Sequence, residues 1–221
     1  MRIGIAGLGT VAQGLLTLLV ENAERITRQA GMPIEVVRIA SRSMKPKVDI
    51  GEALFDTALE SLLHDDVDVV VELMGGLDAA HELISSALIR GKPIVTANKA
   101  VLAEYGNEWF NGNATVGIEA AVAGGIPIVS ILKNGLSGNR IDWLVGIING
   151  TCNYILTAMD EQGTSFASAL AKAQELGYAE ADPGFDVDGV DAAQKLALLA
   201  ALAFDIPVSM DDMYIEGISG V

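Results

Sequence analysis

One acidic stretch and the helix that follows it carry the residues best suited to chemistry. The stretch begins at Gly177, and the apolar helix after it is expected to start at the N-cap Asp188 and end at Phe204. Asp191 and Lys195 lie four residues apart, so they share one face of this helix. The lysine is either half of an exposed ion pair or a buried proton donor held in place by the carboxylate. The spacing alone leaves both interpretations open.

A second lysine follows a short apolar run. Pro93–Thr96 is expected to form a parallel strand, and Lys99 comes three residues after it. Open α/β sheets bind ligands beyond the carboxyl ends of their strands. Lys99 is therefore a candidate site residue, whereas His64 is expected to be a surface residue and His81 a structural one.

The first element that could position a cofactor is a glycine-rich turn. Arg2–Ala6 and Ile34–Ala40 are predicted strands, and an amphipathic helix is expected between them, ending near Gln29. The turn before this helix, Gly7–Ala12, has the pattern G-x-G-x-x-A. Its glycines allow a tight turn and a close approach of the backbone to a pyrophosphate, and the helix N-terminus supplies N–H groups. The unit predicts dinucleotide binding, with a purely structural glycine-rich turn as the alternative.

The residues at the end of the second strand help to distinguish NAD from NADP as the cofactor. Sites that prefer NAD place an acid here, which holds the ribose 2′-OH. The sequence instead reads Ala40-Ser41-Arg42-Ser43. Arg42 could hold the 2′-phosphate of NADP, or it could be a solvated loop residue. The pattern favours NADP without excluding NAD.

The remaining patterns alternate between strands and helices and predict a Rossmann-type, doubly wound parallel α/β sheet. The expected elements of this first region are a helix at Gly51–Leu63, a strand at Asp66–Leu73, a helix at Asp78–Arg90 and a strand at Ala114–Ile118.

A second region begins near residue 130. It is expected to contain a strand at Arg140–Ile148, a helix capped by Asn149 or Thr151, and a further helix capped by Ser165. We assign residues 1–130 to an NAD(P)-binding Rossmann domain and residues 131–221 to a second, α+β domain.

The loop between the two regions, Glu119–Pro127, combines a carboxylate with glycines and a proline. Such a loop exposes carbonyl oxygens, which together with a carboxylate could surround a hard cation. Taken by itself, an ordinary loop is the commoner interpretation.

Composition excludes several classes of function. The chain has 221 residues, 51% of them hydrophobic, and a net charge of −15, which argues against nucleic acid or an anionic membrane as a partner. Its longest apolar runs are too short for a membrane span. The lone Cys152 excludes an internal disulfide and a cysteine-based metal site. No signal peptide precedes the first strand, so we expect a soluble cytoplasmic protein.

Several motifs spread over nearly the whole chain together resemble homoserine dehydrogenase at the level of the family. They are Gly7–Gly14, Val95-Thr-Ala-Asn-Lys-Ala100, Gly117–Pro127, Ile148-Asn-Gly-Thr-Cys-Asn-Tyr154, Gly177-Tyr-Ala-Glu-Ala-Asp-Pro183 and Asp188-Gly-Val-Asp-Ala-Ala-Gln-Lys195.

The resemblance implies the NAD(P)-dependent interconversion of L-aspartate 4-semialdehyde and L-homoserine, a step toward threonine and methionine. It implies Lys195 as the proton donor, and Lys99 as a second essential lysine near the nicotinamide and the substrate. It also implies that residues 131–221 are a partial substrate-binding, catalytic and dimerisation domain through which a homodimer forms. The other implied roles are substrate contacts at Glu180 and Asp191, cofactor contacts at Gly7, Leu8, Gly9, Thr10, Val11 and Gly177, and a sodium site made by Glu119 with the carbonyls of Val122, Gly124 and Ile126.

The chain also departs from the family. Family members continue further, complete the substrate region, return a segment to the nucleotide domain and often add a regulatory domain. We also count five strands in the first region, where a complete doubly wound domain has about six. The sequence therefore leads us to expect a fragment or a truncated form whose own activity is open.

Two other functions compete with this interpretation. A nucleotide-binding module or redox sensor without catalysis would fit a truncated chain. A phosphorylating semialdehyde dehydrogenase would need a thiolate nucleophile beside a base. Cys152 lies at a helix start and both histidines lie in the first region, which disfavours this second alternative.

Overall fold

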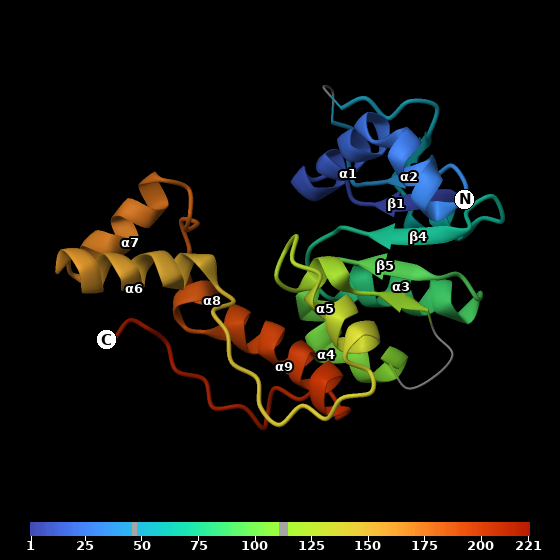
Figure 1. Ribbon diagram of the computed structural model, residues 1–221. Helices are drawn as coiled ribbons and strands as arrows, with labels where there is room; N and C mark the ends of the chain where they lie inside the picture. Colours follow the sequence, from blue (N-terminus) through green and yellow to red (C-terminus); the bar gives the residue numbers. More distant parts are fainter. Residues whose placement is uncertain (46–47, 111–114) are drawn as a thin grey trace. The chain divides into compact units, whose positions relative to one another are not determined.

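The computed structural model describes residues 1–45, 48–110 and 115–221. These residues form two compact units, Met1–Gly124 and Gly125–Val221 (Figure 1). None of the helices in these ranges is long and apolar enough to cross a membrane.

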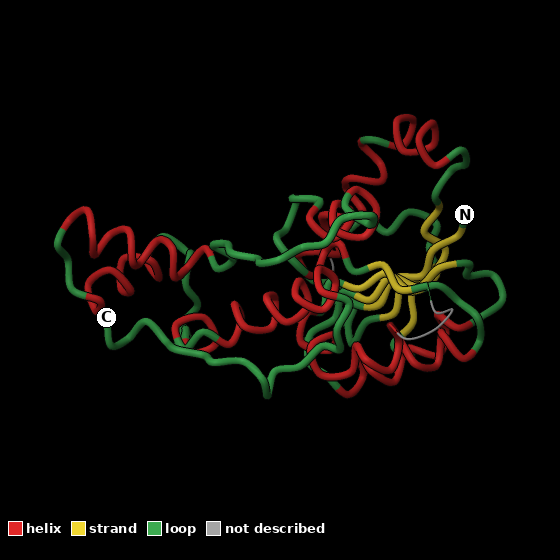
Figure 2. Tube along the Cα trace, turned by 60° about the horizontal axis from the view of Figure 1, so that its bottom comes forward, coloured by secondary structure: helices red, strands yellow, loops and turns green. Residues whose placement is uncertain are grey.

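The first unit is built on a six-stranded sheet with the order β3-β2-β1-β4-β5-β6, in which every neighbouring pair is parallel. Figure 2 shows the strands as one twisted layer, in yellow. The strands are β1 (Arg2–Ala6), β2 (Glu35–Ala40), β3 (Leu54–Asp56), β4 (Val69–Glu72), β5 (Ile94–Thr96) and β6 (Val116–Gly117). The helices are α1 (Thr10–Glu21), α2 (Ala23–Ala30), η1 (Leu59–Leu63), α3 (Asp78–Ile89), α4 (Lys99–Phe110) and η2 (Glu119–Ala121).

Helices cover both faces of this sheet. On one face, Ile3 and Ile5 of β1 belong to the same buried cluster as Leu16 of α1. On the other face, a Cβ atom at Gly4 would lie 3.1 Å from Leu62 of η1, and α3 contacts η1, β4 and β5. Alternate residues of a strand point to opposite faces, so β1 is packed from both sides. The doubly wound α/β fold expected from the sequence is confirmed.

The predicted helix at 51–63 is wrong. Its middle forms β3, which pairs with β2 through Arg38 opposite Leu54 and Ala40 opposite Asp56. The Asp56 carboxylate then accepts a hydrogen bond from the Ala58 amide at 2.9 Å and closes the strand, before the short 3₁₀ helix η1. The sheet therefore has six strands, and the count of five was one too low.

Two other boundaries differ from the sequence prediction. The first helix does not run unbroken to Gln29, because it ends at Glu21 and α2 begins at Ala23. Of the strand expected at 114–118, the structure contains β6, and Ala114 lies outside the described residues.

The second unit is helical in its described part. Its elements are α5 (Ile128–Ser130), the π-helical turn η3 (Ile131–Gly135), α6 (Gly150–Gln162), α7 (Phe166–Glu175), α8 (Gly184–Val187) and α9 (Val190–Phe204). Helices α6 and α7 pack side by side (Figure 1) around a core that includes Ile155 and Ala173. Asn149 and Ser165 cap these helices, each accepting a hydrogen bond from the amide three residues later. The predicted caps are confirmed, with Asn149 rather than Thr151 as the first.

The strand predicted at 140–148 is wrong for the described structure. The segment has no regular secondary structure, because none of the described residues pairs with it as a second strand. The alternate apolar residues Trp143, Val145 and Ile147 are 74%, 77% and 79% exposed.

The predicted N-cap of α9 is also wrong. Gly189 is the N-cap, with φ of 86°, while Asp188 ends the short helix α8. A Cβ atom at Gly189 would lie 3.1 Å from Ile215 and 3.2 Å from the Glu216 carbonyl. The C-terminal segment therefore passes close to the start of α9 and requires a glycine there.

Candidate functional site

The glycine-rich turn has the geometry that a dinucleotide needs. Gly7 has φ of 96°, and a Cβ atom there would lie only 2.7 Å from the Leu73 carbonyl oxygen. A Cβ atom at Gly9 would meet nothing within 4 Å, and Gly9 is the N-cap of α1 without a side-chain cap. A phosphate can therefore approach the backbone at Gly9 and meet the helix N-terminus.

Some residues of this turn are buried against the sheet, and others are exposed to solvent. Leu8 and Ala12 are buried at 1% and 0% exposure, which fixes the turn against the sheet, whereas Thr10 and Val11 are exposed. Arg42 is exposed beyond the end of β2. Sequence reasoning missed Asp56, which lies beside this strand end on β3 and could be found only once β3 itself was known.

A buried carboxylate lies at the carboxyl end of β4. Glu72 is 0% exposed, and its Oε1 accepts a hydrogen bond from the Met74 amide at 2.7 Å. The Thr96 hydroxyl, at the end of β5, donates to its Oε2. Burial raises the pKa of Glu72 above the ordinary glutamate value, while these hydrogen bonds act in the opposite direction. Sequence reasoning passed over this residue because it is an acid inside an otherwise apolar strand.

Lys99 is the first residue of α4 and is half-buried. Asn98 just before it is 9% exposed, and its Oδ1 accepts a hydrogen bond from the Val101 amide in the first turn. The structure thus places Lys99 beyond the carboxyl end of β5, as the sequence predicted. Its role in chemistry remains a prediction.

The second unit contains the ion pair expected on α9. Lys195 Nζ lies 2.6 Å from Asp191 Oδ2, and the two side chains are only 19% and 6% exposed. The lysine also donates to the Ile148 carbonyl at 3.0 Å. The pair is therefore not the exposed surface pair that the spacing alone allowed.

Three further side chains connect this pair to the start of α6. Asn149 Nδ2 donates to Asp191 at 2.8 Å and to Asp186 at 2.7 Å. Thr151 donates its hydroxyl to the Tyr178 carbonyl at 2.7 Å and lies 3.1 Å from Asp186 Oδ2. Sequence reasoning treated Asn149 and Thr151 only as caps and did not single out Asp186, although this acid lies in the same acidic stretch.

These residues line a cavity of about 500 Å³ within the second unit. The lining is Asn149, Gly150, Thr151, Tyr154, Gly177, Tyr178, Asp186, Asp191 and Lys195. Gly177, with φ of 77°, thus lies with Lys195, whereas Glu180 is exposed and is not part of this lining. A larger hollow of about 1020 Å³, beside α1 and β2, contains no residue of the glycine-rich turn.

Cys152 is unsuited to thiolate chemistry. Burial, followed by the nearby charges of Asp186 and Asp191, raises the pKa of its thiol above the ordinary value. A nucleophilic cysteine requires a lowered pKa. This opposes the phosphorylating alternative.

The predicted cation ligands lie where the two units meet in sequence. Glu119 is half-buried in η2, Val122 is buried and Gly124 ends the first unit, whereas Ile126 belongs to the second unit and is 61% exposed. The described residues contain no group of three or more His, Cys, Asp or Glu side chains that could hold a metal.

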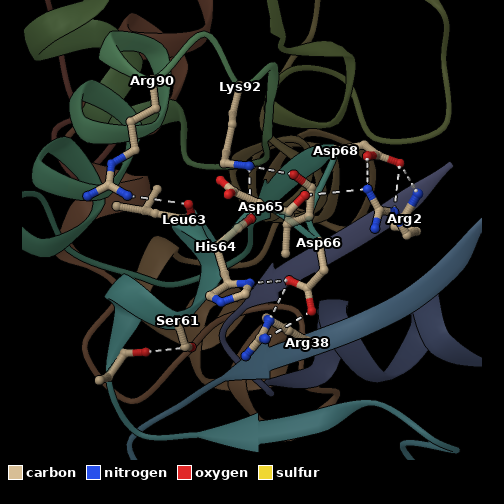
Figure 3. A network of polar contacts seen from close by, with 12 residues as sticks. Arg2, Arg38, Ser61, Leu63, His64, Asp65, Asp66, Asp68, Arg90 and Lys92 are labelled. Atoms are coloured by element: carbon tan, nitrogen blue, oxygen red, sulfur yellow. Dashed lines mark hydrogen bonds and ion pairs between the residues drawn. The ribbon is translucent and has the colours of Figure 1, made fainter.

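The amino-terminal edge of the sheet carries a separate polar network (Figure 3). Arg2 pairs with Asp68 at 2.8 Å, and Arg38 pairs with Asp66 at 2.7 Å. The hydrogen bond from Arg2 lowers the pKa of Asp68 to about 2, and that from Arg38 lowers the pKa of Asp66. His64, exposed as expected, contacts Asp66 at 3.2 Å. The network lies at the opposite ends of the strands from the glycine-rich turn and is structural.

The comparisons with known proteins agree with the two units. A family model described as "Homoserine dehydrogenase, NAD binding domain" matches residues 7–123. A second, described as "Homoserine dehydrogenase", matches residues 127–221.

Curated and solved relatives give the same result. A homoserine dehydrogenase of Pseudomonas aeruginosa is 52% identical over 99% of this chain and 52% of its own length. The crystal structure of a homoserine dehydrogenase from Thiobacillus denitrificans superposes with a TM-score of 0.95 at 50% identity, covering 100% of this chain and 53% of that one. A hyperthermophilic archaeal homoserine dehydrogenase in complex with NADPH has a TM-score of 0.79 at 27% identity, over 93% of this chain and 70% of that one.

The chain spans about half the length of the curated relatives it matches. The matches nevertheless cover both units from the glycine-rich turn to the last residue. On this basis, the chain belongs to the homoserine dehydrogenase family.

Proposed function

We propose that this chain forms the cofactor-binding and catalytic part of an enzyme that reduces L-aspartate 4-semialdehyde to L-homoserine with NAD(P)H. The observation that carries the proposal is the lysine of α9. Lys195 lies in the wall of a small cavity, and Asp191 and the Ile148 carbonyl fix its ammonium group. The identity of the substrate is inferred from membership of the homoserine dehydrogenase family.

A reduced nicotinamide would supply a hydride to the aldehyde carbon. Lys195 would then donate one proton to the carbonyl oxygen as negative charge develops there, and the resulting neutral amine would regain a proton from water. An ammonium group has three N–H donors, and two are used by Asp191 and Ile148. In the proposed reaction the third would donate to the substrate oxygen.

The acidic residues suit the other end of the substrate. L-aspartate 4-semialdehyde carries an α-ammonium group, and we propose Glu180 and Asp191 as its contacts. Asp191 would have a second role, because its Oδ2 also fixes Lys195.

The first unit would hold the cofactor. We propose Gly7, Leu8, Gly9, Thr10 and Val11 as contacts of the dinucleotide, because the space at Gly9 and the uncapped α1 N-terminus fit a pyrophosphate. Lys99 would lie near the nicotinamide, and Gly177 of the second unit would be a further contact.

We propose NADP as the preferred cofactor, with NAD also possible. Arg42, exposed after β2, is suited to a 2′-phosphate, because an arginine offers a planar set of donors to such a group.

Three further parts of the proposal follow from the family. Glu119 and the carbonyls of Val122, Gly124 and Ile126 would bind a monovalent cation, with sodium as the first candidate. The protein would act as a homodimer. Its product would enter threonine and methionine synthesis.

The test is an assay of the whole protein with L-aspartate 4-semialdehyde, following the oxidation of NADPH and of NADH separately, and repeated with sodium replaced by a large organic cation. We expect turnover with both cofactors and a higher kcat/KM with NADPH. Binding of NADPH without turnover by the whole protein would contradict the proposal and favour a nucleotide-binding module.

A further inference from the structure

We infer that Glu72 is a positioning residue for the nicotinamide end of the cofactor site. It would act through the two loops that follow β4 and β5. The inference rests on the proposed function, since it requires a dinucleotide along the carboxyl edge of the sheet. Neither the motifs in the sequence nor the family resemblance assigned a role to Glu72.

The Glu72 carboxylate connects two neighbouring strand ends. Its Oε1 accepts from the amide of Met74, in the loop after β4. Its Oε2 accepts from the hydroxyl of Thr96, the last residue of β5. The same hydroxyl oxygen accepts from the Asn98 amide at 2.9 Å, in the loop after β5. One fully buried carboxylate therefore fixes the start of both loops.

Asn98 closes the connection between the loops. Its Nδ2 donates to the Gly76 carbonyl at 2.8 Å, which returns to the loop after β4. Its Oδ1 accepts from the Val101 amide and thereby holds the first turn of α4. Lys99 is the first residue of that helix. A shift at Glu72 would therefore be transmitted to Gly76 and to the backbone of Lys99.

The topology identifies which part of a dinucleotide these loops would meet. In doubly wound sheets the adenosine ribose lies at the end of β2, and the dinucleotide crosses the sheet at the point where the strand order reverses. Here that point lies between β1 and β4. The loops after β4 and β5 are therefore on the nicotinamide side, and Arg42 after β2 is on the adenosine side.

The Glu72 side chain joins the two loops because each of its oxygens accepts a hydrogen bond. Burying a charged group is unfavourable unless it is fully hydrogen-bonded, and Glu72 accepts from two donors on two loops. A glutamine has one acceptor oxygen and one NH₂ group. A glutamine whose oxygen accepts from the Met74 amide can still donate its NH₂ group to the Thr96 hydroxyl, which has two acceptor lone pairs, so both links can survive. A leucine of similar size has no acceptor oxygen and loses both.

The experiment compares two ligands on the 221-residue chain and on the whole protein. NADPH contains both halves of the cofactor, and adenosine 2′,5′-bisphosphate contains only the adenosine half. Glu72→Leu and Thr96→Val break the link, Thr96→Ser keeps the hydroxyl, and Glu104→Gln changes an exposed glutamate of α4 as a matched control. Both dissociation constants are measured by titration calorimetry, and folding is checked by circular dichroism.

We expect Glu72→Leu and Thr96→Val to weaken NADPH roughly tenfold, the size expected when a buried hydrogen-bonding group loses its partner. The bisphosphate should bind within about twofold of the parent, and Thr96→Ser and Glu104→Gln should behave as the parent does. Equal weakening of both ligands would overturn the inference, because it would show a general effect on the fold. Unchanged NADPH binding in both of the variants that break the link would overturn the inference as well. If the parent itself fails to bind NADPH, the proposed function fails first, and this inference with it.

Discussion

Replacing Lys195 by alanine tests the proposed proton donor and the buried ion pair together. The change removes the cation that faces Asp191 at 2.6 Å and leaves that carboxylate, only 6% exposed, with the Asn149 amide as a donor. It also removes the donor to the Ile148 carbonyl. Stability and turnover should therefore both fall, for separate reasons.

The expected loss of stability can be bounded from these contacts. Breaking a fully buried ion pair costs about 3–5 kcal/mol, and leaving one buried group without its partner costs about 1–3 kcal/mol. Asp191 keeps the hydrogen bond from Asn149, and the adjoining cavity can admit water, so we expect about 2 kcal/mol. The loss of general acid catalysis should lower kcat by roughly 10² to 10⁴.

Urea unfolding measures the first effect, and NADPH oxidation by the whole protein measures the second. Lys172→Ala is the matched control, because Lys172 pairs with Glu175 at 2.8 Å with both side chains more than half exposed. The control should show no measurable change in stability. NADPH affinity should stay within a few-fold of the parent in Lys195→Ala. Near-parental turnover in that variant would refute the assignment of the proton donor.

Three other predictions concern the cofactor, assembly and pH. Arg42→Ala should weaken NADPH more than NADH, because only NADPH carries a 2′-phosphate, and an equal effect on both would show that Arg42 is only a solvated residue. The chain should dimerise through residues 140–148, and Val145→Asp should prevent this; light scattering that finds only the 23.1 kDa monomer at tens of micromolar would contradict it. Because the folded-state pKa of Asp68 is lowered from 3.8 to about 2, its stabilising effect is present above pH 3.8 and is lost as the pH falls toward about 2. Asp68→Asn should therefore lower the melting temperature near neutral pH and lose this difference in acid, as calorimetry between pH 2 and 7 can check.

The local elements of the fold could be predicted from the sequence, and the non-local ones could not. The turn at Gly7–Val11 was predictable because its glycine spacing is a local pattern, although the close approach of the Leu73 carbonyl to Gly7 is not visible in the sequence. Strand β3 is only three residues long and exists because it pairs with β2, so its own sequence gives a weak signal. Residues 140–148 have the alternation of a strand, but pairing, which alternation does not supply, decides whether a strand forms.

In the candidate site, too, local contacts could be predicted from the sequence and contacts between distant residues could not. Asp191 and Lys195 were predictable as a pair because one helical turn separates them. The contact between Asn149 and Asp186 joins residues 37 positions apart, and no periodicity encodes it. Glu72 was hidden for a different reason, since an acid within a hydrophobic strand gives no indication of its partner Thr96 on the next strand.

The hydrogen bond from Lys195 to Ile148 would make the activity of the proposed enzyme depend on protein concentration. Ile148 is the last residue of the segment 140–148, whose alternate side chains are exposed. If subunits associate through this segment, association also fixes the carbonyl that orients the ammonium group. Catalytic power per subunit should then rise with protein concentration and level off at the same midpoint as dimer formation. Dilution would inactivate the enzyme before it unfolds.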